Sequence, residues 1–257
     1  MFNKLWNKRR PLVARSGFIF LAILVISILY ALRLAFTRSR TEKVIRILCF
    51  GDSLTAGTTN VASKSTKLHP YSMKLQQHFD FHDHTVFGRS IRPIFEVHNA
   101  GIPGERVVDQ MVPRLKQILQ RARTNYSWVV ILGGTNDLRK YRKDISFIGD
   151  YLTILRALEK LHNMTHKYRA KTVAVTIPDQ ECIGLGTCGA LKNTQYKINE
   201  LLRNFAAHNA DKVILADLAR EVFLPRDENL WSDWVHFTVK GYDKMADVIY
   251  NSMKDHV

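Results

Sequence analysis

Short apolar runs alternate with longer amphipathic stretches along most of the chain. Five runs are nearly continuous in apolar residues, as expected of strands covered on both faces: 44–50, 94–98, 128–132, 172–177 and 212–216. Five stretches between or after them have the apolar spacing of helices: 71–79, 107–122, 148–164, 191–207 and 239–253. Alternation of this kind predicts an α/β fold with a mainly five-stranded parallel sheet.

A long apolar segment precedes the alternating region. Residues 17–36 contain a single charge, at Arg33, and a helix of this length spans about 30 Å, the thickness of a bilayer core. A cleaved signal peptide is the main alternative, but Ala31-Leu32-Arg33 is a poor cleavage site, which favours an uncleaved anchor. The sequence therefore predicts four parts: a basic tail 1–16, a transmembrane signal-anchor 17–36, a stem 37–43 and a domain 44–257.

The formal net charge of +15 is concentrated at the amino-terminal end. Residues 1–43 contain nine Lys or Arg and one acid, so that +8 of the total lies there and the domain is only mildly basic. No nucleic-acid-binding motif is visible in the domain, and we predict no nucleic-acid partner. The distribution of charge slightly favours a cytosolic amino terminus and a luminal or extracellular domain. Possible N-glycosylation sites at Asn125 and Asn163 are consistent with this topology.

The three cysteines have no further Cys or His nearby at the spacing of metal ligands, so we predict no metal site. Cys49 lies inside the first apolar run and is expected in the core. Cys182 and Cys188 bracket a glycine-rich loop and can pair in an oxidising compartment. A G-x-G-x-x-G pattern at 184–189 begins too far from its strand to bind a dinucleotide, so we predict no cofactor.

Small and polar residues gather where the predicted strands end. Three motifs follow or end the first three strands and a fourth precedes the last helix: Gly51-Asp52-Ser53-Leu54, Asn99-Ala100-Gly101, Gly134-Thr135-Asn136-Asp137 and Asp233-Trp234-Val235-His236. Each motif alone is explained by turn chemistry. The carboxyl ends of parallel strands, however, meet at one edge of the sheet, where such folds bind ligands. Together the motifs bring a hydroxyl, an imidazole, a carboxylate and an amide to that edge.

These four blocks resemble, in order and spacing, those of the SGNH or GDSL-type serine hydrolases. The resemblance covers 44–257 and implies a three-layer α/β/α flavodoxin-like sandwich and a serine esterase mechanism. By matching position, Ser53 would be the nucleophile, His236 its base and Asp233 the acid that orients the base. The backbone N–H groups of Ser53 and Gly101 and the amide of Asn136 would form the oxyanion hole.

This resemblance agrees with elementary chemistry, since a serine hydroxyl is a weak nucleophile until a base removes its proton. The expected substrate is an ester or thioester carried by a lipid, a glycan or a small molecule. Candidate substrate contacts are Trp231, Trp234 and His69, for which packing is the alternative explanation. Two other functions stay open: acyl transfer through the same acyl-enzyme, and noncatalytic binding of glycan or lipid at a membrane.

Overall fold

The computed structural model describes residues 23–30, 43–59, 67–81, 93–140, 151–182, 186, 188–222 and 228–257. The chain divides into two units, Met1–Lys43 and Val44–Val257. In the first unit, residues 23–30 are helical and their side chains are exposed. Within the described ranges, every helix is too short or too polar to cross a bilayer. The predicted tail, and all of the predicted anchor and stem except residues 23–30 and 43, lie outside these ranges.

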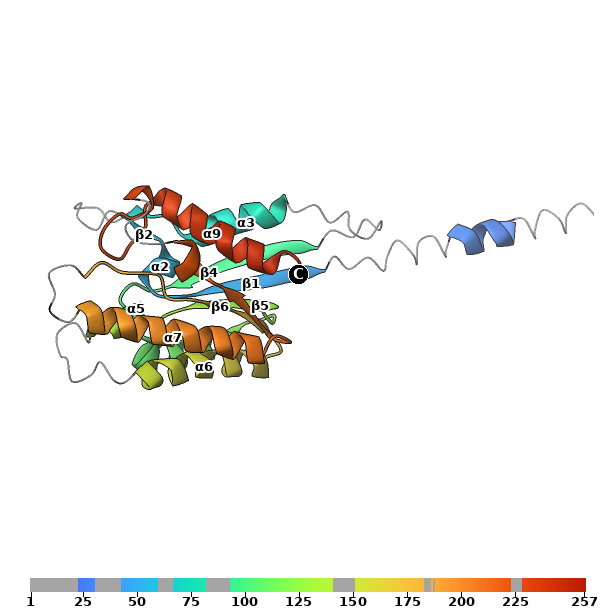
Figure 1. Ribbon diagram of the computed structural model, residues 1–257. Helices are drawn as coiled ribbons and strands as arrows, with labels where there is room; N and C mark the ends of the chain where they lie inside the picture. Colours follow the sequence, from blue (N-terminus) through green and yellow to red (C-terminus); the bar gives the residue numbers. More distant parts are fainter. Residues whose placement is uncertain are drawn as a thin grey trace, which may run out of the picture. The chain divides into compact units, whose positions relative to one another are not determined.

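The second unit is built on a five-stranded parallel sheet (Figure 1). Its strands are β1 (Val44–Gly51), β4 (Ile94–Gly101), β5 (Trp128–Leu132), β6 (Lys171–Val175) and β7 (Val213–Ala216). The order across the sheet is β4-β1-β5-β6-β7, and every neighbouring pair is parallel. If these five strands alone are numbered in chain order, the order across the sheet is 2-1-3-4-5, which is that of flavodoxin-like sheets. The predicted parallel sheet is therefore confirmed.

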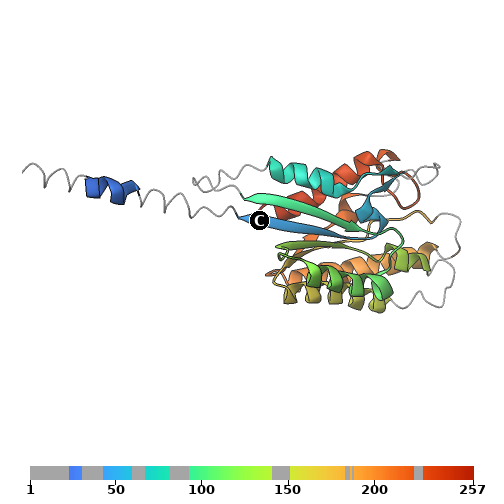
Figure 2. The ribbon, with the colours of Figure 1, turned by 180° about the vertical axis from the view of Figure 1, so that it is seen from behind.

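Helices cover both faces of the sheet (Figures 1 and 2). On one face lie α3 (Tyr71–Asp80) and α9 (Val239–Met253); on the other lie α4 (Val112–Arg121), α6 (Tyr151–Lys167) and α7 (Cys188–His208). Successive side chains of a strand point to opposite faces, so β1 supplies Ile47 and Cys49 to the first layer and Leu48 and Phe50 to the second. Two apolar cores on either side of one sheet make the three-layer arrangement.

The helix expected over 107–122 consists of two parts. A π-helical turn, η2 (Val107–Met111), precedes α4. Pro113 has no N–H to donate to the carbonyl four residues earlier. In the turn before it, the N–H of Met111 donates to the carbonyl of Arg106 (3.0 Å), five residues back. The widened turn stays apolar on its inner side, because Val107 and Met111 are both fully buried.

Short elements occupy the carboxyl edge of the sheet and its surroundings. α2 (Ser53–Ala56) follows β1, α5 (Thr135–Lys140) follows β5, and α8 (Leu218–Glu221) follows β7. A small hairpin of β2 (Thr58–Thr59) and β3 (Lys67–Leu68) comes after α2, and η4 (Glu228–Leu230) precedes the loop that leads to α9. The residues predicted to carry chemistry lie on or beside these elements.

Candidate active site

Ser53 is the first residue of α2, directly after the buried strand β1. The side chain of Asp52 caps this short helix by accepting a hydrogen bond from the N–H of Leu54 (3.0 Å). Gly57 ends it in the left-handed conformation, with φ of 78°. Because β1 is flanked by β4 and β5, where the strand order reverses, Ser53 lies at the point where flavodoxin-like sheets bind ligands.

Ser53 lies beside His236, which is 183 positions further along the chain. The Nε2 atom of His236 is 3.0 Å from the Oγ atom of Ser53, and the Nδ1 atom of His236 is 2.8 Å from the Oδ2 atom of Asp233. The serine and the histidine are both buried, with 6% and 8% of their surfaces exposed. A hydroxyl, an imidazole and a carboxylate thus form one hydrogen-bonded chain. They belong to the three residues that were predicted to form the triad.

The loop before α9 holds the imidazole and the carboxylate together. The Oδ1 atom of Asp233 accepts hydrogen bonds from the N–H groups of Val235 (2.8 Å) and His236 (2.7 Å). Burial alone would raise the pKa of Asp233, but the hydrogen bonds from the His236 side chain and from the two N–H groups outweigh it and lower this pKa. An ionised carboxylate only accepts hydrogen bonds, so Nδ1 of His236 donates to it and Nε2 is left to accept the serine proton.

Gly101, predicted as an oxyanion donor, has a different role in the structure. Its N–H donates to the Oδ1 atom of Asn99 (3.0 Å). A Cβ atom at this position would lie 2.1 Å from the backbone nitrogen of Ala56, so glycine is required for β4 to pass close to α2. The prediction overlooked the short polar side chain two residues earlier, which folds back onto this N–H group.

Gly104, three residues after Gly101, was not among the predicted site residues. Within the described ranges, its N–H donates to no other group, and the same is true of the N–H of Ser53. Gly104 is exposed and has φ of 83°, a conformation that favours glycine. The Pro103-Gly104 pair is a sequence signal for a turn with positive φ at its second residue, and could have drawn attention to this position.

Asn136 lies in the first turn of α5 and faces the same loop as Gly104. Its Nδ2 atom donates to the carbonyl of Glu105 (2.9 Å), which uses one of the two amide N–H groups. The adjacent Asp137 accepts hydrogen bonds from the N–H groups of Val107 (2.9 Å) and Val108 (3.2 Å). Burial raises the pKa of Asp137, and these bonds oppose that effect. α5 is therefore fastened to the turn that follows β4.

Asn99 links the end of β4 to two other elements. Its Nδ2 atom donates to the carbonyl of Thr55 (2.7 Å) in α2 and to the hydroxyl of Ser72 (3.1 Å) in α3. One side chain thereby holds the helix that carries Ser53 against the sheet edge. Asn99 belonged to a predicted motif, but only the fold reveals its partners, which are 44 and 27 residues away.

The predicted substrate contacts differ in their surroundings. Trp231 is 9% exposed, and its ring packs against that of Phe237 with 4.4 Å between centroids, which makes it a core residue. Trp234 is half-buried, and its carbonyl accepts a hydrogen bond from the N–H of Glu181 (2.8 Å). The Nε2 atom of His69 is 2.9 Å from the Oδ1 atom of Asp243 on α9. Substrate contact by Trp231, Trp234 and His69 stays a prediction.

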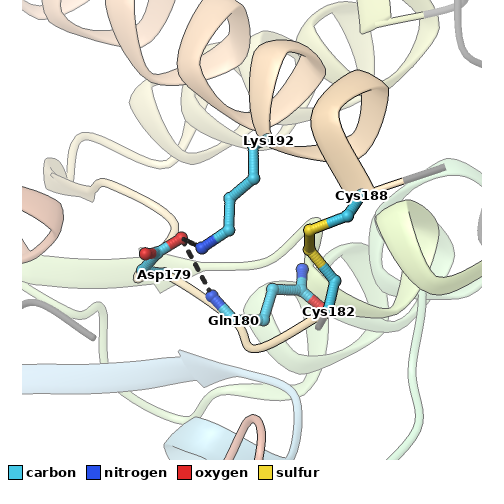
Figure 3. The surroundings of a disulfide bond; sticks show 5 residues. All are labelled: Asp179, Gln180, Cys182, Cys188 and Lys192. Atoms are coloured by element: carbon cyan, nitrogen blue, oxygen red, sulfur yellow. Dashed lines mark hydrogen bonds and ion pairs between the residues drawn. A yellow bond between two sulfur atoms is a disulfide. The ribbon is translucent and has the colours of Figure 1, made fainter. Parts of the chain in front are cut away.

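Cys182 and Cys188 are joined by a disulfide at the start of α7 (Figure 3). Figure 3 also shows the ion pair of Asp179 with Lys192, which links the same segment to α7. Asn125 and Asn163 are both exposed. Across the described part of the chain, no group of three or more His, Cys, Asp or Glu side chains has the arrangement of a metal site.

The fold and this site define a class, that of flavodoxin-like α/β proteins with a candidate serine-hydrolase triad at the carboxyl edge of the sheet. The chain belongs to the GDSL-like lipase/acylhydrolase family, a family of ester hydrolases, whose model matches residues 49–244. A comparison with curated proteins found no match.

Solved structures share the fold at low sequence identity. Est24, a carbohydrate acetylesterase from Sinorhizobium meliloti, is 16% identical, with a TM-score of 0.62 over 83% of this chain and 100% of that one. The aryl esterase of M. smegmatis is 18% identical, with a TM-score of 0.60 over 83% and 100% of the two chains. A G-D-S-L family lipolytic protein from Veillonella parvula is 20% identical, with a TM-score of 0.58 over 80% and 97%. These similarities establish the fold.

Proposed function

We propose that this chain is a serine esterase that cleaves a carboxylic ester or thioester through an acyl-enzyme at Ser53. The observation that carries the proposal is the hydrogen-bonded chain from Ser53 through His236 to Asp233, with links of 3.0 and 2.8 Å. It lies at the carboxyl edge of a flavodoxin-like sheet, at the point where such folds bind their ligands. Membership of the acylhydrolase family supports the same reaction.

In the proposed reaction, the Oγ atom of Ser53 attacks the carbonyl carbon while its proton moves to Nε2 of His236. Asp233 accepts the Nδ1 hydrogen throughout and stabilises the imidazolium. Collapse of the tetrahedral intermediate breaks the bond to the leaving group, which takes the proton from His236. A water molecule then attacks the acyl-enzyme and gives a proton to His236. That proton returns to Ser53 as the carboxylic acid leaves.

The negative charge on the substrate oxygen requires donors that are already in place. We assign this role to the N–H of Ser53, the N–H of Gly104 and the amide of Asn136. Gly104 replaces Gly101 in this assignment, because the N–H of Gly101 is bonded to Asn99. The hydrogen bond from the Asn136 amide to the carbonyl of Glu105, next to Gly104 in the chain, supports a common site for the last two donors.

The substrate follows less directly from the geometry. One structural neighbour is a carbohydrate acetylesterase and another an aryl esterase, so short acyl esters of sugars and phenols are the first substrates to test. Acyl transfer to an alcohol would use the same acyl-enzyme, and product analysis with an added acceptor alcohol distinguishes it from hydrolysis. A noncatalytic binding module is disfavoured, since it has no use for an intact hydroxyl–imidazole–carboxylate chain.

We also propose that residues 17–36 form a single membrane anchor with the domain on the luminal or extracellular side. An apolar stretch with a single charge, at Arg33, between basic flanks supports the anchor. The disulfide supports an oxidising compartment. Alkaline carbonate extraction tests the anchor, and glycosidase shifts that disappear on substitution of Asn125 and Asn163 test the topology. Full release by carbonate would contradict the anchor.

The decisive experiment is the substitution Ser53→Ala in the full-length chain. We expect it to abolish hydrolysis of 4-nitrophenyl acetate and labelling by a fluorophosphonate probe, while thermal unfolding stays close to that of the wild type. Ser252→Ala is the matched control, because Ser252 is a half-buried serine of α9 whose hydroxyl donates to the carbonyl of Ile249 (2.7 Å). Esterase activity that survives in Ser53→Ala, or a wild type that neither turns over nor reacts with the probe, would refute the proposal.

A further inference from the structure

One arginine side chain fastens together the segments that carry the oxyanion donors. Arg114 lies on α4, and its Nη2 atom donates to the carbonyl of Gly51 (3.1 Å) at the end of β1. Its Nη1 atom donates to the carbonyl of Ala100 (2.8 Å) near the end of β4. Its Nε atom donates to both carboxylate oxygens of Glu105 (2.7 and 2.8 Å), to which Nη2 also bonds. A single guanidinium thus joins the end of β1 to the end of β4 and to the turn that follows it.

Two of these contacts, Gly51 and Glu105, lie one or two residues from a proposed donor, and the third, Ala100, lies four residues before Gly104. Gly51 precedes Ser53 by two residues, and its carbonyl also accepts the N–H of Ile102 (3.0 Å). Glu105 directly follows Gly104. The backbone carbonyl of Glu105 accepts the hydrogen bond from Asn136, so that the same residue joins the Arg114 fork to the third donor. The three donors are therefore spaced by one shared set of hydrogen bonds.

The arginine acts on the site through position rather than through charge. The side chains of Arg114 and Glu105 are 16% and 8% exposed, and the two opposite charges offset each other. The guanidinium also lies over the ring of Phe50, 4.1 Å from its centroid. A planar fork with five donors can satisfy this set of acceptors, whereas a lysine ammonium cannot. Within the described ranges, the hydrogen bonds of Arg114 reach none of the three triad residues.

We propose that Arg114, paired with Glu105, is a positioning residue that sets the geometry of the oxyanion hole. This inference rests on the proposed esterase activity. Oxyanion donors stabilise the transition state more than the bound substrate, so their displacement lowers kcat and leaves KM nearly unchanged. Loss of one donor typically costs about 100- to 1,000-fold in rate, and a displaced donor costs a part of that.

The test compares matched conservative variants of the full-length chain. Arg114→Lys keeps the charge opposite Glu105 but loses the fork. Arg203→Lys is the control. The guanidinium of Arg203 donates two hydrogen bonds to the carboxylate of Asp217 (2.8 and 2.7 Å), and its side chain is 13% exposed. These bonds involve none of the proposed donors. A double variant, Glu105→Gln with Arg114→Gln, removes both buried charges together and avoids leaving one of them unpaired.

Fluorophosphonate titration counts the folded molecules, and kcat is expressed per folded molecule. We expect Arg114→Lys and the double variant to lower this kcat by about 10- to 100-fold, with KM within about threefold of the wild type. The affinity for an arylboronic acid, which forms a tetrahedral adduct on serine, should fall by the same factor as kcat. A purely structural role would change the titrated fraction but neither of these values. Arg203→Lys should leave both within about twofold of the wild type.

The inference is overturned if both Arg114 variants keep kcat and boronate affinity within about threefold of the wild type. It is also overturned if KM rises while kcat is unchanged, or if neither variant folds, since Arg114 would then be needed for folding rather than for the oxyanion hole. A wild-type protein without esterase activity would refute the proposed function instead, and the two failures are therefore distinguishable.

Discussion

The carboxyl group of Asp52 makes the stability of this protein depend on pH in a predictable direction. Asp52 is fully buried beneath the Ser53 turn, and its Oδ2 atom has no hydrogen-bond partner within the described ranges. Burial raises the pKa of Asp52 from 3.8 to about 7. The hydrogen bond from Leu54 lowers this pKa, and the nearby carboxyl of Asp137 raises it further. The folded protein therefore holds a proton on Asp52 that the unfolded chain releases.

The sign and size of the effect follow from proton linkage. Where the native state binds more protons than the unfolded state, the free energy of unfolding falls as pH rises. The stabilisation is fully present below the unfolded pKa of Asp52, near 3.8, and is lost as pH rises through the folded pKa of about 7. A difference of roughly three pKa units corresponds to about 4 kcal/mol.

Asp52→Asn removes this dependence, because an amide is neutral at every pH and its oxygen still accepts the hydrogen bond from Leu54. Urea-induced unfolding at several pH values between 4 and 8.5 gives the free energy of unfolding for both proteins. As pH rises across this range, we expect the free energy of unfolding of the wild type to fall by about 4 kcal/mol relative to that of the variant. Asp255→Asn, at an exposed carboxyl, is the control. Parallel pH curves for wild type and Asp52→Asn would refute the reasoning.

Two further predictions concern the triad and the disulfide. Asp233→Asn should lower kcat for 4-nitrophenyl acetate by about 10³- to 10⁴-fold. An amide N–H opposite Nδ1 of His236 favours the tautomer with its hydrogen on Nε2, which then cannot accept the proton of Ser53. A loss below about tenfold would show that the carboxylate does not orient the imidazole. Replacing Cys182 and Cys188 by serine should lower the free energy of unfolding in urea by about 2 kcal/mol, because the bond closes a loop with a sequence separation of 6. Reduction of the wild type should have the same effect, and an unchanged urea midpoint would contradict it.

The strands and the outer helices were predictable because their signals are local. A buried parallel strand is a continuous apolar run, and the runs at 44–50 and 128–132 are found as β1 and β5 within one residue. The last helix was predicted at 239–253, as observed, because its apolar positions recur with the helical period. The π turn of η2 was not predicted, since the four-residue spacing of apolar positions in 107–122 indicates an α-helix and carries no signal for a widened turn.

Among the predicted site residues, those that act through side chains were easier to predict than those that act through backbone N–H groups. Ser53, Asp233 and His236 were predicted as a triad because they lie in motifs that resemble, in type and order, those of a known family. Backbone donors have no such mark. Gly101 and Gly104 lie three residues apart, and it is the fold that shows the N–H of Gly101 bonded to Asn99 and Gly104 in a turn with positive φ.

The sequence by itself determined the elements and the parallel sheet, because apolar period and turn chemistry are properties of neighbouring positions, and the order of its motifs named the candidate triad. Tertiary structure alone decided how those residues meet. The distance of 3.0 Å between Ser53 and His236 depends on the strand order that brings the end of β1 beside the loop before α9. The fork of Arg114 likewise depends on three carbonyl and carboxylate groups converging in space. Hydrogen bonds form between atoms about 3 Å apart, and separation along the chain does not encode that proximity.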